Sequence, residues 1–160
     1  MTILYVLVGV PGSGKTTWIG HQTFNWDRTV HVSTDQFVEK YARTVGKTYK
    51  EVFEYVMPSA VSQMAMQARK GFVDDKIVVW DQTSTTILSR AKKLRMCPEH
   101  YTKIAVVFDT PGPETHAKFL DRPGKEIPNE VIADMIKNFE TPTIEEGFDK
   151  IIKARLLGIE

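Results

Sequence analysis

The sequence has little cysteine, little excess charge and no long apolar run, and each absence excludes a class of protein. Cys97 is the single cysteine among 160 residues, so an intramolecular disulfide cannot form. No apolar run approaches the length of a membrane span, and Met1-Thr2-Ile3 lacks the basic stretch of a signal peptide. A formal net charge of +1 leaves no overall positive field for coating nucleic acid. These absences predict one cytoplasmic domain with no membrane segment.

Histidine and cysteine offer no metal site in the sequence. The four histidines, at positions 21, 31, 100 and 116, lack the spacing of metal ligands, so we expect surface or packing roles for them. Cys97 precedes Pro98 near the end of an expected helix and carries no surrounding nucleophile motif. A packed or half-exposed thiol is therefore expected there.

What the sequence does contain is an alternation of strand-like and helix-like segments. Val- and Ile-rich apolar runs predict strands, covered on both faces, at 3–8, 29–33, 76–81 and 103–108. Helical patterns occur at 15–24, 35–44, 49–70, 84–96, 113–120 and 130–139. The run at 149–153 fits either a fifth strand or a helix. We therefore predict an α/β fold, a single domain over residues 1–160 with a parallel sheet of four to five strands flanked by helices.

A glycine-rich motif lies between the first expected strand and the first expected helix. Residues 9 to 16 read Gly-Val-Pro-Gly-Ser-Gly-Lys-Thr, which matches the P-loop pattern. In such a loop, backbone amides and the helix N-terminus face a phosphate chain. Lys15 is expected to bridge the β- and γ-phosphates of ATP, and Thr16 to bind Mg²⁺. The predicted nucleotide contacts are Gly9, Pro11, Gly12, Ser13, Gly14, Lys15, Thr16 and Thr17.

Polar clusters follow three strands, at the edge of a parallel sheet where ligands bind: Ser33-Thr34-Asp35, Asp81-Gln82-Thr83 and Asp109-Thr110. Asp35 either accepts the proton of an acceptor hydroxyl or lies in a helix turn capped by Ser33 or Thr34. Asp81 either meets Mg²⁺, contacts substrate, or caps the helix near Ser84. Asp109 is typical of a turn.

Residues 121 to 128 read Asp-Arg-Pro-Gly-Lys-Glu-Ile-Pro, a sequence that interrupts any helix. The helical patterns on either side predict a lid over about residues 121–129 that covers the phosphates and excludes water. Arg122 either stabilises charge on the γ-phosphate during transfer or pairs at the surface with Asp121 or Glu126.

Taken in order, the P-loop, Asp35, Asp81-Gln82-Thr83 and the segment from Arg122 to Pro128 resemble the polynucleotide 5′-kinase family of P-loop phosphotransferases. The carboxyl-terminal part is similar to the kinase domain of the animal polynucleotide kinase/phosphatase, and the amino-terminal half to the phage enzyme. The resemblance covers essentially the whole chain. It implies transfer of the γ-phosphate of ATP to a 5′-hydroxyl of DNA or RNA. Lys15 would hold phosphates, Thr16 the Mg²⁺, Asp35 would be the general base and Arg122 the lid arginine.

The chain departs from that family on the acceptor side. The phage enzymes have an arginine three residues after the aspartate, where this chain has Val38. Ser33-Thr34 replaces an Asn-Arg pair, and Gln82 and Ser84 stand where an asparagine is expected near Thr83. Two alternatives therefore stay open: a kinase for a hydroxymethylated base in phage DNA, or a small-molecule kinase for a nucleoside or sugar. A regulatory NTPase is disfavoured because no residue stands out to position water.

Basic residues supply candidate contacts to a nucleic-acid acceptor. Lys40, Arg43, Lys47 and Lys50 lie near Tyr41 and Tyr49, and a second cluster comprises Arg90, Lys92, Lys93 and Arg95. These clusters either line a groove for phosphates and bases or form solvated helix faces. The expected acceptor contacts are Asp81, Thr83, Lys40, Arg43 and Arg90. The oligomeric state is left open, and a phage-encoded enzyme in the host cytoplasm would fit the resemblance.

Overall fold

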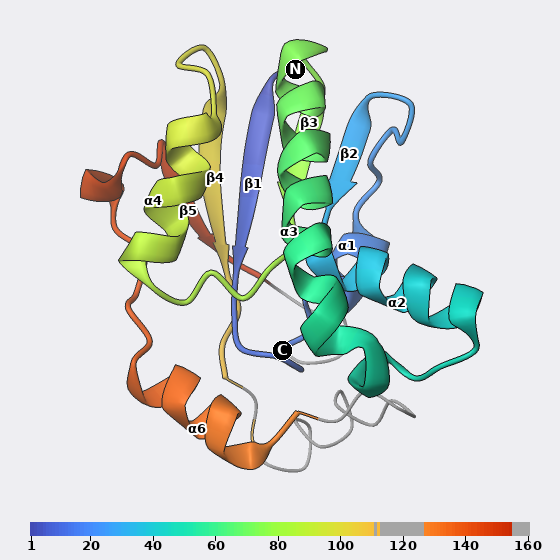
Figure 1. Cartoon of the computed structure of the whole chain (residues 1–160). Helices are drawn as coiled ribbons and strands as arrows, with labels where there is room; N and C mark the ends of the chain where they lie inside the picture. Colours follow the sequence, from blue (N-terminus) through green and yellow to red (C-terminus); the bar gives the residue numbers. More distant parts are fainter. Residues whose placement is uncertain (111, 113–126, 155–160) are drawn as a thin grey trace.

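The computed structural model describes residues 1–110, 112 and 127–154, which form a parallel sheet with helices on both faces (Figure 1). The strands are β1 (Ile3–Val8), β2 (Thr29–Val32), β3 (Ile77–Trp80), β4 (Thr102–Val107) and β5 (Lys150–Lys153). Their order is β2-β3-β1-β4-β5, and every neighbouring pair is parallel. The predicted α/β domain is confirmed, with a 5-stranded sheet.

The ambiguous run near the carboxyl end is a strand. β5 pairs with β4, so that Ile151 lies opposite Ala105. Asp149 fixes the start of the strand, because its amide donates to the Lys103 carbonyl at 2.8 Å and its carboxylate accepts from the Lys103 amide at 2.8 Å. The short apolar run alone fitted either a strand or a helix, and its pairing with β4 makes it a strand.

The described helices are α1 (Lys15–His21), α2 (Thr34–Val45), α3 (Tyr49–Val73), α4 (Ile87–Met96), α6 (Asn129–Lys137) and the short 3₁₀ turn η1 (Ile144–Glu146). None of them is long and apolar enough to cross a membrane. The expected helix at 113–120 lies outside the described residues. So does the expected lid up to residue 126, and residues 127 and 128 precede α6 without helical structure.

Local capping explains why α4 begins three residues later than the sequence pattern indicated. Ser84 has a left-handed backbone (φ 47°), which interrupts a helix. Thr86 then caps α4: its side chain accepts from the Ser89 amide at 3.2 Å, and the Ser89 hydroxyl accepts from the Thr86 amide. The predicted start at residue 84 is therefore wrong.

The core has two apolar layers, one on each face of the sheet. On one face, Trp18 and Ile19 of α1 pack against strand residues such as Leu7. On the other face, which Figure 1 shows in front, α3 contributes Ala68 and Phe72. Strands covered on both faces read as continuous apolar runs, which is why the sequence located them correctly.

The strand order creates a crevice at the carboxyl end of β1. From β1 the chain moves to β2 on one side of the sheet, and from β3 it crosses to β4 on the other side. Ligands of open parallel sheets bind at such a reversal. The loop that leaves β1 at this point contains residues 9–14 of the glycine-rich segment, and α1 begins at Lys15.

Candidate active site

The loop after β1 has a backbone that glycine makes possible. Gly12 and Gly14 have left-handed φ values of 78° and 99°, which residues with a Cβ adopt at a cost. A Cβ on Gly9 would collide with the Ser13 hydroxyl and lie 2.8 Å from the Phe108 Cβ. The loop therefore folds closely over β1 and turns directly into α1 at Lys15.

Hydrogen bonds hold the loop in a shape that suits a phosphate chain. The Lys15 ammonium donates to the carbonyls of Gly9 and Val10 at 2.9 and 3.0 Å. The Gly9 amide donates to the Thr83 carbonyl at 2.9 Å, which ties the loop to the segment after β3. The Ser13 hydroxyl is buried and has no hydrogen-bond partner among the described residues. A glycine cradle, a lysine and the start of a helix are the groups that bind triphosphates.

A cleft of about 730 Å³ opens beside this loop. Its lining brings together Pro11, Gly12, Gly14, Lys15, Thr16 and Thr17 from the loop and α1, and Asp35, Asp81 and Thr83 from two other strand ends. Gly9 and Ser13 do not line the cleft, and they lie against each other within the loop. Six of the predicted nucleotide contacts and the two candidate aspartates therefore share one cavity.

Asp35 lies in the first turn of α2 and is held by a tyrosine. The Tyr49 hydroxyl donates to Asp35 Oδ1 at 2.6 Å. Burial, followed by the hydrogen bond and the charge of Asp35, raises the pKa of Tyr49 far above its usual value. Tyr49 therefore remains a donor at any ordinary pH. Ser33, at the N-cap of α2, makes no side-chain capping bond.

Asp81 is bonded to a histidine that the sequence analysis had assigned to surface or packing. His31 Nε2 lies 2.8 Å from Asp81 Oδ2, and Gln36 Nε2 lies 2.9 Å from His31 Nδ1. When Gln36 donates to Nδ1, the Nε2–H of His31 donates to the carboxylate. Asp81 does not cap α4, because Thr86 does so. Recognising this pair from sequence requires knowing that β2 lies beside β3.

The end of the cleft beyond Asp35 is aromatic and carries charges of both signs. The start of α3 contributes Tyr49, Phe53, Tyr55 and Met57, and α6 contributes Val131 and Met135. Among the charged side chains that line it, Lys50 is basic, whereas Glu51 and Glu54 are acidic. This wall suits a flat apolar ring better than a run of phosphates.

The buried position of Val38 explains one departure from the polynucleotide kinase pattern. Val38 is fully buried and packs with Ala42, Val52 and Val56 between α2 and α3. A side chain at this position faces the helix pair, so a cation here would not reach the cleft without displacing that core.

The expected acceptor contacts on α2 do not line the cleft. Lys40 lines a separate cavity between α2 and α3. Arg43 lies exposed in the last turn of α2 and does not line the cleft either.

Arg90, an expected acceptor contact, does not line the cleft. It is 0% exposed. Its guanidinium donates to both carboxylate oxygens of Glu146, at 2.7 and 3.1 Å, and to the Ser84 carbonyl at 2.9 Å. Burial alone would raise the pKa of Glu146, but hydrogen bonds from Arg90 and Thr143 outweigh it and lower that pKa. Arg90 therefore joins α4 to η1.

Lys93, from the same predicted basic cluster, is also buried. Its ammonium lies 5.7 Å from the ring centroid of Trp80 and donates to the Ser89 carbonyl at 3.3 Å. Burial, and next the charges of Arg90 and Lys92, lower the pKa of Lys93 to about 8. With two members inside the protein, the cluster on α4 is not a surface groove.

Thr16 and Asp81 are the candidate ligands of a cation among the described residues. Among the residues that the structure describes, no three His, Cys, Asp or Glu side chains group as a metal site. Thr16 and Asp81 both line the cleft and are oxygen donors of the kind that Mg²⁺ accepts. Arg122, the predicted lid arginine, lies outside the described residues.

A P-loop beside a five-stranded parallel sheet, with a cleft at the strand ends, defines a nucleotide-binding domain of the P-loop kinase type. The model of the AAA domain family matches residues 4–142. The chain belongs to that family. Its fold supports a phosphotransferase that binds a nucleotide.

Solved structures share this fold at low sequence identity. An inferred kinase of Chloroflexus aurantiacus is 17% identical with a TM-score of 0.65, over 96% of this chain and 89% of that one. A fungal RNA kinase is 15% identical (TM-score 0.56; 97% of this chain, 38% of that chain). Shikimate kinase from Acinetobacter baumannii is 20% identical (TM-score 0.56; 97% and 85%).

The chain spans only part of some of these proteins. It covers 38% of the fungal RNA kinase, and 51% of a chain from the PezAT toxin-antitoxin system of Streptococcus pneumoniae. The neighbours named as kinases include one for RNA and one for a small molecule, and the shared fold does not separate these acceptors.

Proposed function

We propose that this chain transfers the γ-phosphate of ATP to a hydroxyl of a polynucleotide, most directly the 5′-hydroxyl end of DNA or RNA. The observation that carries the proposal is the shared cleft. The P-loop residues Lys15 and Thr16 line one part of it, and Asp35 lines another beside an aromatic wall. A phosphate donor and a flat-ringed acceptor would then meet between the lysine and the carboxylate.

In this reaction Asp35 acts as the general base. It accepts the proton of the acceptor hydroxyl while the acceptor oxygen bonds to the γ-phosphorus. The bond from that phosphorus to the β–γ bridging oxygen breaks, and ADP leaves. Lys15 binds the β- and γ-phosphates, and Tyr49 fixes the carboxylate through its bond to Oδ1. Arg122 is proposed to cover the phosphates from the lid.

Magnesium is proposed to bind through Thr16, with Asp81 directly or through water. When bound, the ion would neutralise charge on the phosphates. Asp81 enters this role already oriented, because His31 holds one of its oxygens at 2.8 Å. Thr83, which lines the same cleft, is proposed to contact the acceptor.

A second acceptor has specific support: a hydroxymethylated base in DNA, or a small nucleoside-like or sugar-like alcohol. Glu51 and Glu54 line the aromatic end of the cleft, and Val38, which stands where the phage enzymes have an arginine, is buried away from the cleft. Such a wall would receive a neutral ring that carries a hydroxyl more readily than a terminal nucleotide with its phosphate.

The test offers ATP labelled on the γ-phosphate, with Mg²⁺, to three matched oligonucleotides. The first carries a 5′-hydroxyl, the second a 5′-phosphate, and the third an internal hydroxymethylated base with blocked ends. Label on the first alone supports an end kinase, and label on the third alone moves the activity to base modification. No label on any of them would overturn a polynucleotide acceptor.

Two variants separate the chemistry from general damage. Asp35→Asn is expected to abolish transfer while ATP binding persists, since the amide cannot take the proton. Asp109→Asn is the matched control, because this exposed carboxylate follows β4 and does not line the cleft. Equal activity of Asp35→Asn and Asp109→Asn would refute the assignment of the base.

A further inference from the structure

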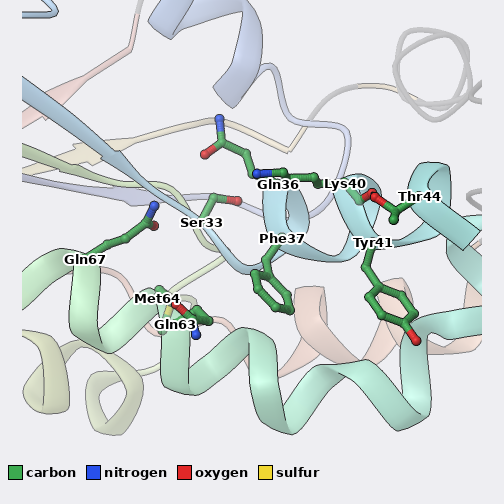
Figure 2. A pocket seen from close by; sticks show the side chains of 9 residues that line it. All are labelled: Ser33, Gln36, Phe37, Lys40, Tyr41, Thr44, Gln63, Met64 and Gln67. Carbon is green, nitrogen blue, oxygen red and sulfur yellow. The ribbon is translucent and has the colours of Figure 1, made fainter.

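A second cavity, of about 460 Å³, lies between α2 and α3 and shares no lining residue with the cleft (Figure 2). Its volume falls within the range of small-molecule sites. Ser33, the residue before Thr34 and Asp35, lines this second cavity, whereas Thr34 and Asp35 line the cleft. The start of α2 therefore has one cavity on each side.

Hydrogen-bonding amides dominate one wall of the second cavity. Gln63 and Gln67 lie one helical turn apart on α3 and are both exposed. Neither side chain makes a hydrogen bond within the described part of the chain. A carboxamide both donates and accepts, and it can match the paired donor and acceptor on the edge of a nucleobase.

Aromatic rings form the facing wall. Phe37 and Tyr41 lie one turn apart on α2, and Figure 2 shows both rings on the side of α2 that faces α3. Tyr41 is 36% exposed, so part of its surface is accessible to solvent. Such rings provide faces on which a base can stack whatever its identity.

Charge restricts the class of ligand further. Lys40 is the sole charged side chain among those that line the cavity, so the cavity is positive. An amide-rich, aromatic and cationic cavity matches the three parts of a nucleotide: the edge of the base, its face and its phosphate.

An aromatic pair links the lining of one cavity to the lining of the other. Tyr41 of the second cavity and Tyr55 of the cleft are packed edge to face, with ring centroids 6.0 Å apart. Tyr55 is 54% exposed. A single strand that enters the cleft can therefore pass over two accessible rings to reach the second cavity.

We propose that the cavity between α2 and α3 binds a nucleotide of the acceptor strand, further along than the one that reacts. Its base stacks on Phe37 and Tyr41 and bonds to Gln63 and Gln67, while Lys40 meets its phosphate. The acceptor strand itself rests on the proposed function, but the chemistry of the cavity does not.

Photocrosslinking tests the position of the strand without requiring catalysis. Oligonucleotides with a 5′-hydroxyl carry one 5-iodouracil at each position in turn, and adducts are mapped by peptide mass spectrometry. An interior label is expected to react with Phe37 or Tyr41, and a terminal label with Tyr49, Phe53 or Tyr55. Interior labels that never modify α2 would overturn the proposal. Free 5-iodo-deoxyuridine monophosphate forms a second arm, and an adduct on α2 from it alone would assign the cavity to a free nucleotide.

Variants then measure the contribution of the cavity. Replacing both Gln63 and Gln67 by Ala should raise the Kd of a long strand about tenfold, as expected for a lost base contact. Lys40→Ala should also raise this Kd, because a phosphate contact is lost. The Kd of an acceptor too short to leave the cleft should not change. Lys70→Ala, an exposed lysine of α3 outside both cavities, is the matched control.

The outcomes separate this site from the proposed function. Transfer to 5′-ends, together with variants that bind strands of every length like the wild type, would refute the site and leave the kinase assignment intact. Adducts on Phe37 or Tyr41 that are lost in the double glutamine variant, without transfer to any oligonucleotide, would support the site and refute the polynucleotide kinase.

Discussion

At the residue scale, the bond between Tyr49 and Asp35 is the feature with the most direct consequence for chemistry. The Tyr49 hydroxyl donates to one carboxylate oxygen of Asp35 at 2.6 Å. Because Asp35 belongs to α2 and Tyr49 to α3, both helices fix the orientation of this carboxylate. As the proposed base, Asp35 would then meet the acceptor hydroxyl in one geometry, and correct geometry is a large part of the catalysis of phosphoryl transfer.

Removing the Tyr49 hydroxyl tests whether its hydrogen bond positions Asp35. Tyr49→Phe is expected to lower kcat about tenfold with little change in the KM for ATP, since positioning of the base is lost and the donor side is untouched. Steady-state kinetics check this, with Tyr5→Phe as the control for loss of a hydroxyl outside the cleft. A change confined to the KM for ATP would contradict a role for Tyr49 in holding Asp35.

Lys93 supplies a prediction about stability. Its folded pKa of about 8 lies below the usual value of 10.5, so the buried charge costs stability below pH 8. Between pH 8 and 10.5 the unfolded chain binds the extra proton, and stability therefore rises with pH. Lys93→Met should stabilise the protein by about 2 kcal/mol at pH 7, after loss of the contacts to Ser89 and Trp80.

Urea unfolding at pH 7 and at higher pH checks the prediction for Lys93. The advantage of Lys93→Met over the wild type should shrink as the pH approaches the usual lysine pKa. Lys70→Met, in the last turn of α3, is exposed and should show no such trend. An advantage that stayed constant with pH would mean that the charge of Lys93 carries no cost.

At the scale of elements, β2, β3 and α2 meet through one imidazole. His31 comes from the middle of β2, Asp81 follows β3, and Gln36 lies in the first turns of α2. The same α2 carries Asp35 and walls of both cavities. The orientation of Asp81 toward the cleft therefore depends on how α2 sits against the sheet edge.

Removing the His31 imidazole is expected to change the Mg²⁺ requirement of the reaction. His31→Ala should raise the Mg²⁺ concentration needed for half-maximal transfer about five- to tenfold, because Asp81 loses its orienting donor. His31→Gln, which can still donate a hydrogen bond, should recover most of that loss. Mg²⁺ titrations of activity measure both variants, with the exposed His21→Ala as control. An unchanged Mg²⁺ requirement in His31→Ala would separate Asp81 from the metal.

At the scale of the whole molecule, the sequence alone predicted those features that depend on residues close together in the chain. The P-loop is a continuous motif, and strands buried on both faces are continuous apolar runs, so both were predicted. Contacts between distant segments were not. Arg90 looked like a surface cation because its partner Glu146 lies 56 positions away, and the His31–Asp81 bond requires the strand order. The aromatic wall of α3 could have been suspected from Tyr49, Phe53 and Tyr55, but its direction depends on how α3 packs on α2.

The near-neutral charge of the whole molecule sets how strongly salt should affect binding of a single strand. Lys50 lines the cleft and Lys40 lines the second cavity, and these two lysines are proposed to meet acceptor phosphates. Two such contacts predict a slope of about 1.4 in log Kd against log salt, or roughly sevenfold weaker binding between about 50 and 200 mM salt. Fluorescence anisotropy of a labelled oligonucleotide measures the slope. Lys40→Ala should lower it by about 0.7 and Lys70→Ala should not. A slope several times steeper would mean that the strand is gripped by many phosphate contacts, which would favour a basic surface over the two cavities as its binding site.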